Sequence, residues 1–176
     1  MRVLDIRRHT MRRKPGDHLS HSGIELARQV GQQSGPFNLV VTSTIPRAIE
    51  TAIAMGFEID ETIDGLGLLP DSVMMAVGWP RRFDEIAPLL SGDVAGFATS
   101  IAGLWRNIAM KLPPSGHGLV VTHGLIIELG ILASMPTASQ WGGPIGYCEG
   151  ARLTYSGVSQ GGEVLRVPSG FQLVEN

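Results

Sequence analysis

The sequence is poor in the residues that build disulfide-bonded, metal-clustered or membrane-spanning proteins. Its 176 residues include one cysteine, Cys148, so neither an internal disulfide nor a thiolate metal cluster can form. This cysteine usage fits a reducing compartment. The sequence lacks a run of about 18 apolar residues that could cross a bilayer, and its start lacks the pattern of a signal peptide. We therefore expect a soluble, cytoplasmic protein with no membrane partner.

Charged residues are also scarce, at 17% of the chain, and they nearly cancel to a formal net charge of -2. A balance of this kind gives no long-range attraction to nucleic acid, so we expect no nucleic-acid partner. The exception is a basic stretch formed by Arg7-Arg8 and Arg12-Arg13-Lys14. Any attraction of an anion should therefore be local to this part of the chain.

Apolar residues make up 43% of the sequence, enough for one compact domain over residues 1–176. Strand patterns alternate with helical ones from start to finish, which predicts an α/β fold with helices on both faces of a mostly parallel sheet, a three-layer α/β/α sandwich. The strands are expected at residues 1–7, 39–41, 57–63, 119–122, 151–155 and 163–167. Residues 64–78 are expected to be irregular, and residues 156–162 to form the turn of a hairpin.

Local signals predict where helices start. Ser22-Gly23-Ile24-Glu25 has the form of a capping box. Ser43 or Thr44 can cap a second helix, which has Pro46 in its first turn. Further helical patterns cover residues 81–90, 95–112 and 125–133.

Basic side chains stand where predicted strands give way to helices. Arg8 and His9 follow the first strand, His123 follows the strand at 119–122, and Arg47 lies in the first turn of a helix. Ligands of open α/β sheets bind at the carboxyl ends of the strands. A neutral imidazole can attack phosphorus, and arginine matches phosphate oxygens with a planar fork of donors. The pattern therefore predicts a phosphoryl pocket.

Four segments carry a resemblance to a known family. Arg8-His9-Thr10 resembles the Arg-His-Gly signature of the histidine phosphatase superfamily, which has the phosphoglycerate mutase-like fold. Leu19-Ser20-His21-Ser22-Gly23 resembles the segment that opens its first helix, and residues 42–52 resemble the segment with its second phosphate arginine. Val120-Val121-Thr122-His123-Gly124 resembles the strand that ends in its second catalytic histidine. The segments occur in the family's order.

The resemblance implies a role for each matching residue. His9 is the nucleophile that becomes phosphorylated, Arg8 and Arg47 clamp the phosphoryl oxygens, and His123 completes the pocket. Thr10 replaces the family glycine, and its hydroxyl offers another donor to the phosphate. The implied reaction uses no metal ion and no cofactor.

The general acid has no clear match in the region where the family carries a glutamate. Asp71 is our prediction, because it lies in the loop beyond the third strand. Glu61 and Asp64 are alternatives, and another part of the chain could supply the group. A carboxylic acid is needed there to protonate the leaving oxygen.

The leading functional hypothesis is a metal-independent phosphatase of the small-phosphatase branch, acting on a phosphorylated small molecule or a phosphoprotein, phosphohistidine included. One alternative is a mutase that transfers the phosphoryl group within a small phosphorylated acid. Another is a non-catalytic phosphate-binding or protein-interaction module. Specificity is expected to lie in residues 64–80, 12–14 and 141–147.

Overall fold

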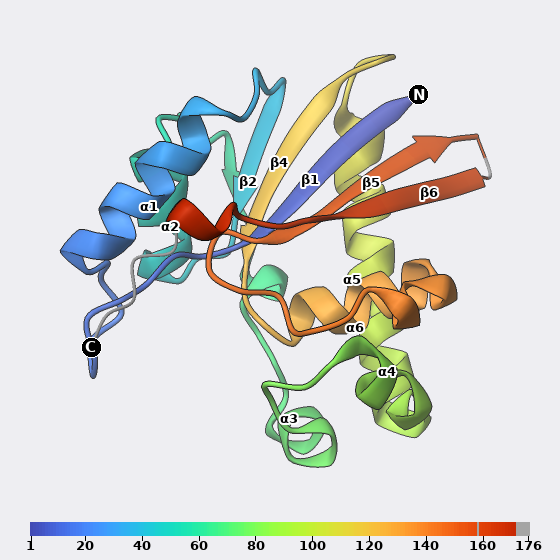
Figure 1. The fold of residues 1–176 in the computed structure, drawn as a ribbon. Helices are drawn as coiled ribbons and strands as arrows, with labels where there is room; N and C mark the ends of the chain where they lie inside the picture. The colour runs from blue at the N-terminus through green and yellow to red at the C-terminus, as the bar shows by residue number, and fades with distance from the viewer. Residues whose placement is uncertain (158, 172–176) are drawn as a thin grey trace.

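A six-stranded sheet forms the centre of the computed structural model, which describes residues 1–157 and 159–171 (Figure 1). The strand order is β3-β2-β4-β1-β5-β6. The first four strands in this order run parallel, β5 runs antiparallel to β1, and β6 runs antiparallel to β5. The strands are β1 (Arg2–Arg8), β2 (Leu39–Thr42), β3 (Glu61–Thr62), β4 (His117–Thr122), β5 (Gly150–Ser156) and β6 (Ser159–Leu165). The predicted α/β class with a mostly parallel sheet is confirmed.

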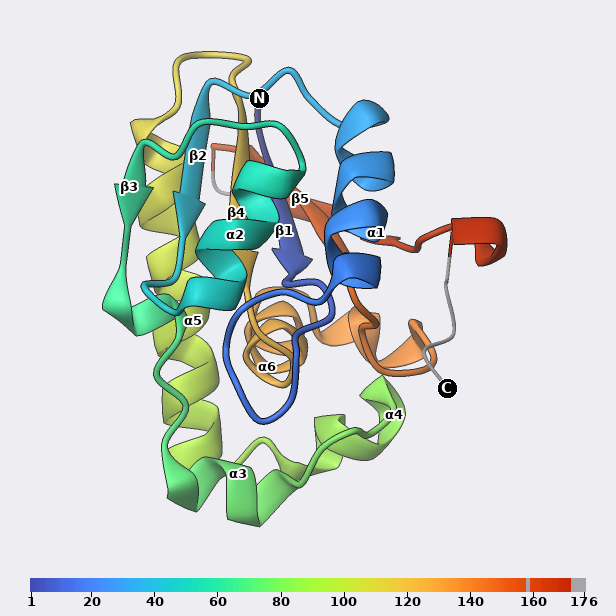
Figure 2. The ribbon, with the colours of Figure 1, turned by 90° about the vertical axis from the view of Figure 1, so that its left-hand side faces the viewer.

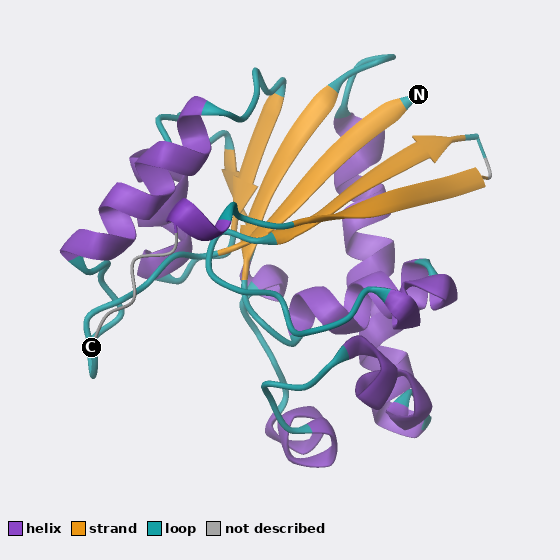
Figure 3. Ribbon diagram, in the orientation of Figure 1, coloured by secondary structure: helices purple, strands orange, loops and turns teal. Residues whose placement is uncertain are grey.

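Helices cover both faces of the sheet (Figure 3). Helices α1 and α2 share one core cluster with one face, and α5 and α6 share the other cluster with the opposite face. The helices are α1 (His21–Gln32), α2 (Pro46–Ala54), α3 (Asp71–Val77), α4 (Phe83–Ile86), α5 (Gly92–Lys111) and α6 (Ile126–Ser134). No single helix within the described ranges is long and apolar enough to cross a membrane, although the sharply bent pair Phe83–Leu89 and Gly92–Lys111 passes the same test when taken together.

The apolar run Leu119-Val120-Val121 in strand β4 is covered on both faces of the sheet. Leu119 and Val121 pack in the cluster that contains α1 and α2, whereas Val120 packs in the cluster that contains α5 and α6. All three side chains are fully buried. A strand covered on both faces needs apolar residues at every position, and the continuous run at 119–122 follows from that.

The N-cap residue of helix α1 lies two residues before Ser22, the predicted cap. Its N-cap is Ser20, which has extended backbone angles and accepts a hydrogen bond from Gly23 N through its side chain. Ser22 lies inside the helix, so the prediction that it caps α1 is wrong. Gly23 packs directly on the preceding loop, where a Cβ atom would lie 2.2 Å from Met11 O.

Helix α2 has no side-chain cap, which contradicts the prediction for Ser43 and Thr44. Its N-cap is Ile45, and the Ser43 hydroxyl bonds to His123 instead. The hydroxyl of Thr44 donates to Asp64. Both residues follow the carboxyl end of β2, and their hydroxyl groups form hydrogen bonds with side chains there.

Two further segments differ from prediction. The region expected to be irregular contains helix α3, and the strand expected over residues 57–63 is reduced to β3. Strand β6 begins at residue 159 and not at residue 163. Gly161 and Gly162, which were expected in the turn, lie within this strand. A Cβ atom at Gly162 would lie 2.8 Å from Arg152 O, so glycine here permits close strand pairing and does not mark a turn.

Candidate active site

The predicted basic side chains meet at the carboxyl end of the parallel strands. His9 follows β1, His123 follows β4, and Arg47 lies in the first turn of α2, which follows β2. Figure 2 shows β2, β4 and β1 ending at the same edge of the sheet, with β4 in the middle and the loop between β1 and α1 beyond their ends. The rings of His9 and His123 have centroids 5.1 Å apart. The structure thus brings together residues that are more than 100 positions apart in the sequence.

The two nitrogen atoms of His9 have different partners, and these partners fix its tautomer. Nδ1 lies 2.7 Å from the carbonyl oxygen of Thr10, which can only accept, so Nδ1 carries the proton. Nε2 lies 3.1 Å from Arg47 Nε, which can only donate, so Nε2 holds a free electron pair. The backbone N–H of His9 donates to Thr122 O at 2.9 Å and ties the residue to β4. Nε2 is therefore the nucleophilic atom of this ring.

Burial keeps His9 neutral. The side chain is 6% exposed, and burial lowers its pKa to about 2, helped by the nearby His123, Arg8 and Arg47. A cation next to a buried imidazole disfavours a second positive charge. The nucleophile is thus unprotonated at neutral pH and well below it.

His123 is held by a side chain that the sequence analysis had assigned to a helix cap. Its Nε2 lies 2.7 Å from Ser43 Oγ, and its Nδ1 is buried with no hydrogen-bond partner in the described part of the chain. Burial, with Arg47 and Arg8 adding to it, lowers the pKa of His123 to about 3. A bound dianion would favour the protonated form, so His123 can gain a proton together with the ligand.

Arg8 lies between two aromatic rings. Its guanidinium carbon is 4.5 Å from the ring centre of Trp79 and 4.2 Å from that of Tyr147, which are cation–π distances. Nη1 donates to Ile145 O at 3.1 Å, while the buried Nε has no partner among the residues described. The stacked plane fixes the direction in which the remaining N–H groups point.

A buried carboxylate connects these supports. Glu128, in the first turn of α6, is fully buried and accepts hydrogen bonds from Trp79 Nε1 at 3.2 Å and Ile145 N at 2.9 Å, two of the residues that contact Arg8. Its other oxygen accepts from Leu125 N at 2.7 Å. Burial raises the pKa of Glu128, and its charge opposes the lowering of the Arg8 pKa by burial.

Arg47 has a second partner besides His9. Its Nη1 donates to Asp17 in the loop between β1 and α1, and the two side chains form an ion pair. Asp17 also acts electrostatically on His123, since its charge opposes the lowering of the His123 pKa. An acidic side chain therefore pairs with the arginine and acts through its charge on His123.

Thr10 is in the site but its donors are used internally. Its backbone N–H donates to Thr51 Oγ1 at 3.0 Å, and its hydroxyl donates to Gly23 O at 3.0 Å. The residue is fully buried. These bonds anchor the end of β1 to α1 and α2, and no donor of Thr10 is brought to the phosphoryl pocket.

The three acidic residues considered from the sequence lie apart from the histidines. Glu61 pairs with Lys111 Nζ at 2.6 Å, and Asp64 accepts from Thr44 Oγ1 at 2.8 Å. Asp71 begins α3, is exposed, and makes no hydrogen bond or ion pair with another described residue. Within the described ranges, none of the three forms a hydrogen bond or ion pair with His9, Arg8, Arg47 or His123.

Sequence reasoning missed Ser43 as a partner of His123, and also Asp17, Trp79, Tyr147 and Glu128. Trp79 and Tyr147 do fall in two of the segments expected to set specificity. Glu128 could have been found as the acidic residue in the first turn of the helix after His123, where carboxylates often bond to backbone N–H groups. Asp17 had no signal except its place in the loop that follows His9.

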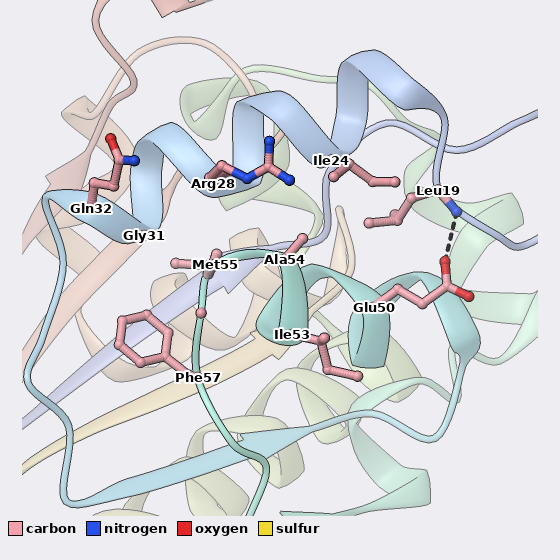
Figure 4. Close-up of a pocket in the computed structure, with 11 residues that line it drawn as sticks. Leu19, Ile24, Arg28, Gly31, Gln32, Glu50, Ile53, Ala54, Met55 and Phe57 are labelled. Carbon is pink, nitrogen blue, oxygen red and sulfur yellow. Dashed lines mark hydrogen bonds between the residues drawn. The ribbon is translucent and has the colours of Figure 1, made fainter.

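A separate groove lies between α1 and α2, with a volume of about 740 Å³ (Figure 4). Leu19, Ile53 and Phe57 contribute to its mostly apolar lining, and Glu50 accepts from Leu19 N at one end. None of the four basic residues of the phosphoryl pocket lines it. Within residues 1–157 and 159–171, no three His, Cys, Asp or Glu side chains gather in a way that could hold a metal ion.

No protein-family model and no curated protein sequence matches this chain. Solved structures do match it. Phosphoserine phosphatase from Entamoeba histolytica, in complex with 3-phosphoglyceric acid, superposes with a TM-score of 0.74 at 18% identity, over 98% of this chain and 100% of that one. Phosphoglycerate mutase from Bacillus anthracis gives 0.68 at 18%, over 93% and 92%.

A mycobacterial glucosyl-3-phosphoglycerate phosphatase gives a TM-score of 0.62 at 18% identity, over 94% of this chain and 98% of that one. The three proteins are phosphatases or mutases of phosphorylated compounds by name, and this chain spans nearly their whole length. The predicted phosphoglycerate mutase-like fold is therefore confirmed.

Proposed function

We propose that this protein is a histidine phosphatase, which hydrolyses a phosphomonoester through a phosphohistidine intermediate on His9 Nε2. The observation that carries the proposal is the pair of hydrogen bonds on the His9 ring. Thr10 O holds the proton on Nδ1, and Arg47 Nε lies against the free pair of Nε2. A neutral nucleophile thus faces a cation that can bind the oxygens of the group under attack.

The remaining side chains fit phosphoryl transfer. Arg8 and Arg47 approach from β1 and α2 and supply planar donors for the phosphoryl oxygens. His123 Nδ1 and Arg8 Nε are buried polar atoms without partners among the described residues, and buried polar atoms normally have one. A phosphoryl group between them would supply acceptors for both. Water then attacks the phosphohistidine and releases phosphate.

The substrate class that we propose is a small phosphorylated molecule. Two structural neighbours are named for phosphoserine and for glucosyl-3-phosphoglycerate, and one is bound to 3-phosphoglyceric acid. All three compounds are phosphate esters of small molecules. The rings of Trp79 and Tyr147 beside Arg8 would form part of the wall next to the phosphoryl pocket.

Hydrolysis of p-nitrophenyl phosphate by the wild type and by His9→Ala, each with and without chelator, tests the proposal. We expect turnover that resists chelator and is abolished in His9→Ala. His21→Ala is the matched control, since His21 is exposed at the start of α1, and it should keep full activity. Turnover that survives His9→Ala would show that the nucleophile is another group.

No turnover by the wild type from acidic to neutral pH would favour the non-catalytic binding module. Transfer of phosphate between two positions of a small phosphorylated acid, without release of free phosphate, would favour the mutase. An aryl phosphate suits the first experiment because its leaving group needs little protonation.

A further inference from the structure

The proposed reaction lacks an identified proton donor. When a phosphate ester with a poor leaving group is cleaved, the departing oxygen must receive a proton, and a positioned carboxylic acid commonly supplies it. The acidic residues beyond β3 do not fill this role by contact. Glu61 is paired with Lys111, Asp64 with Thr44, and Asp71 is exposed on α3 with no described partner.

Asp17 is the carboxylate that the structure places at the pocket. Its Oδ1 accepts from Arg47 Nη1, and Arg47 Nε donates to His9 Nε2. One guanidinium group therefore separates the carboxylate from the nucleophilic atom. The charge of Asp17 also reaches His123, whose ring centroid lies 5.1 Å from that of His9. These two relations place the Asp17 carboxylate against Arg47 and within electrostatic reach of His123.

The loop that carries Asp17 is fastened at several points. Arg12 Nη1 donates to Gly16 O at 2.8 Å within the loop, and Arg13 N donates to His18 O at 2.9 Å. On α2, Glu50 bonds to the His18 side chain, and it accepts from Leu19 N, as Figure 4 shows. Asp17 therefore lies between residues with fixed partners, and a fixed acid can meet a leaving group in a defined direction.

We propose that Asp17 is the general acid and base of this site, a proposal that rests on the phosphatase function above. In the first step, His9 Nε2 forms a bond to phosphorus, the bond from phosphorus to the leaving oxygen breaks, and the Asp17 carboxyl proton moves to that oxygen. In the second step, water attacks phosphorus, its proton moves to the Asp17 carboxylate, and the bond between phosphorus and Nε2 breaks. The products are the alcohol and inorganic phosphate.

Substrate binding gives Asp17 its proton. In the structure, the Asp17 side chain pairs with Arg47. The phosphoryl oxygens compete for the same guanidinium and bring negative charge next to the carboxylate, and like charges close together favour the protonated form. Binding of the phosphoryl group thus replaces the ion pair between Asp17 and Arg47 with a like-charged neighbour that favours the acid form of Asp17.

The test compares Asp17→Asn with the wild type on two esters, p-nitrophenyl phosphate with a good leaving group and phenyl phosphate with a poor one. Asparagine keeps an oxygen that can accept from Arg47 but has no proton of carboxylic acidity. We expect kcat/KM for phenyl phosphate to fall by about 100-fold or more, in the range known for loss of a general acid. The p-nitrophenyl phosphate value should fall less than about tenfold, because that oxygen leaves without a proton.

The matched control is Asp84→Asn. The Asp84 side chain is 52% exposed and pairs with Arg82, and the Asp17 side chain is 52% exposed and pairs with Arg47. The control should hydrolyse both esters like the wild type. Equal losses on both esters in Asp17→Asn, or no loss on either, would overturn the proposal, as would a selective loss on phenyl phosphate in Asp71→Asn, Asp64→Asn or Glu61→Gln. A wild type inactive on both esters, or an active His9→Ala, would instead overturn the phosphatase function itself.

Discussion

Two neighbours fix the tautomer of the His9 ring, because one can only accept a hydrogen bond and the other can only donate one. The Thr10 carbonyl oxygen can only accept and the Arg47 Nε–H can only donate, so the ring has one proton and its position is fixed. The contact from Arg47 also aims the guanidinium, because the same group is held from its other side by Asp17. The proposed nucleophile, the arginine cation and the proposed acid are thus connected in a row by hydrogen bonds.

This row predicts that lysine cannot replace Arg47. An ammonium group offers a compact charge on a flexible chain, and it cannot place one donor on His9 and another on Asp17 in the arginine geometry. Hydrogen bonds to charged groups contribute about 1.5–3 kcal/mol, so we expect Arg47→Lys to lower kcat/KM for p-nitrophenyl phosphate by about 10- to 100-fold. Inorganic phosphate should also inhibit the variant more weakly.

The control for this substitution is Arg28→Lys. Arg28 is an exposed arginine on α1 that pairs with Glu25, and its replacement should leave both kcat/KM and phosphate inhibition unchanged. Full activity of Arg47→Lys would mean that a positive charge suffices at this position and that the direction of its donors is unimportant.

At the level of elements, the turn between β4 and α6 positions more than His123. Leu125 has a φ angle of 65°, which is costly for a residue with a branched side chain. Its N–H is bound by Glu128, and Trp79 packs so closely on Gly124 that a Cβ atom there would lie 2.7 Å from the indole. One carboxylate thus fixes the turn, the indole and the backbone at Ile145.

We predict that Glu128→Gln weakens phosphate binding through Arg8. The amide has one oxygen, so its NH₂ group must face an N–H donor that the carboxylate accepted, and an unsatisfied buried group costs about 1–3 kcal/mol. Urea unfolding should show a loss of stability of this size, and the phosphate inhibition constant should rise. In an Arg8→Ala background, the additional effect of Glu128→Gln on phosphate inhibition should disappear.

Asp5→Asn is the comparison for this element. Asp5 is equally buried, on β1, and pairs with Arg152 and His117. Its replacement should lower stability while leaving phosphate inhibition unchanged. If both variants change phosphate inhibition alike, the effect of Glu128→Gln is a general loosening of the fold and is not transmitted through Trp79 and Ile145.

Local sequence patterns predicted which strands and helices form more accurately than the residues at which they begin and end. The apolar run at 119–122 and the residues Arg8, His9, Arg47 and His123 were readable, because a strand end followed by a helix is a property of neighbouring residues. The first cap was misassigned because Ser20 and Ser22 both suit it, and only the loop packed on Gly23 decides between them. The contacts of Ser43 with His123 and of Asp17 with Arg47 join residues that are 80 and 30 positions apart, which no local pattern encodes.

At the level of the whole molecule, the site lies where the two hydrophobic clusters, one on each face of the sheet, meet the carboxyl ends of the strands. The cluster with α1 and α2 holds the backbone around Arg47, and the cluster with α5 and α6 holds the turn after His123. The rings of His9 and His123 lie between these layers and are therefore almost fully buried. Burial that suits a neutral nucleophile at neutral pH must cost stability in acid, since protonated imidazole cannot be accommodated there.

This cost predicts the pH dependence of unfolding. Burial lowers the pKa values of His9 and His123 in the folded protein to about 2 and about 3, from the ordinary histidine value of 6.5. Below about pH 6.5, the unfolded chain therefore binds protons that the folded chain does not, and the free energy of unfolding falls as the pH falls. Each histidine contributes up to about 1.4 kcal/mol per pH unit.

Urea unfolding of the wild type and His9→Ala between pH 7 and pH 5, without phosphate, measures this contribution. The wild-type slope of unfolding free energy against pH should exceed that of His9→Ala by up to about 1.4 kcal/mol per unit. Glu128, whose pKa is raised by burial, acts in the opposite direction, but it is present in both proteins and cancels in the difference. Equal slopes would mean that His9 takes up its proton in the folded state as easily as in the unfolded chain. The conclusion that burial keeps His9 neutral would then be wrong.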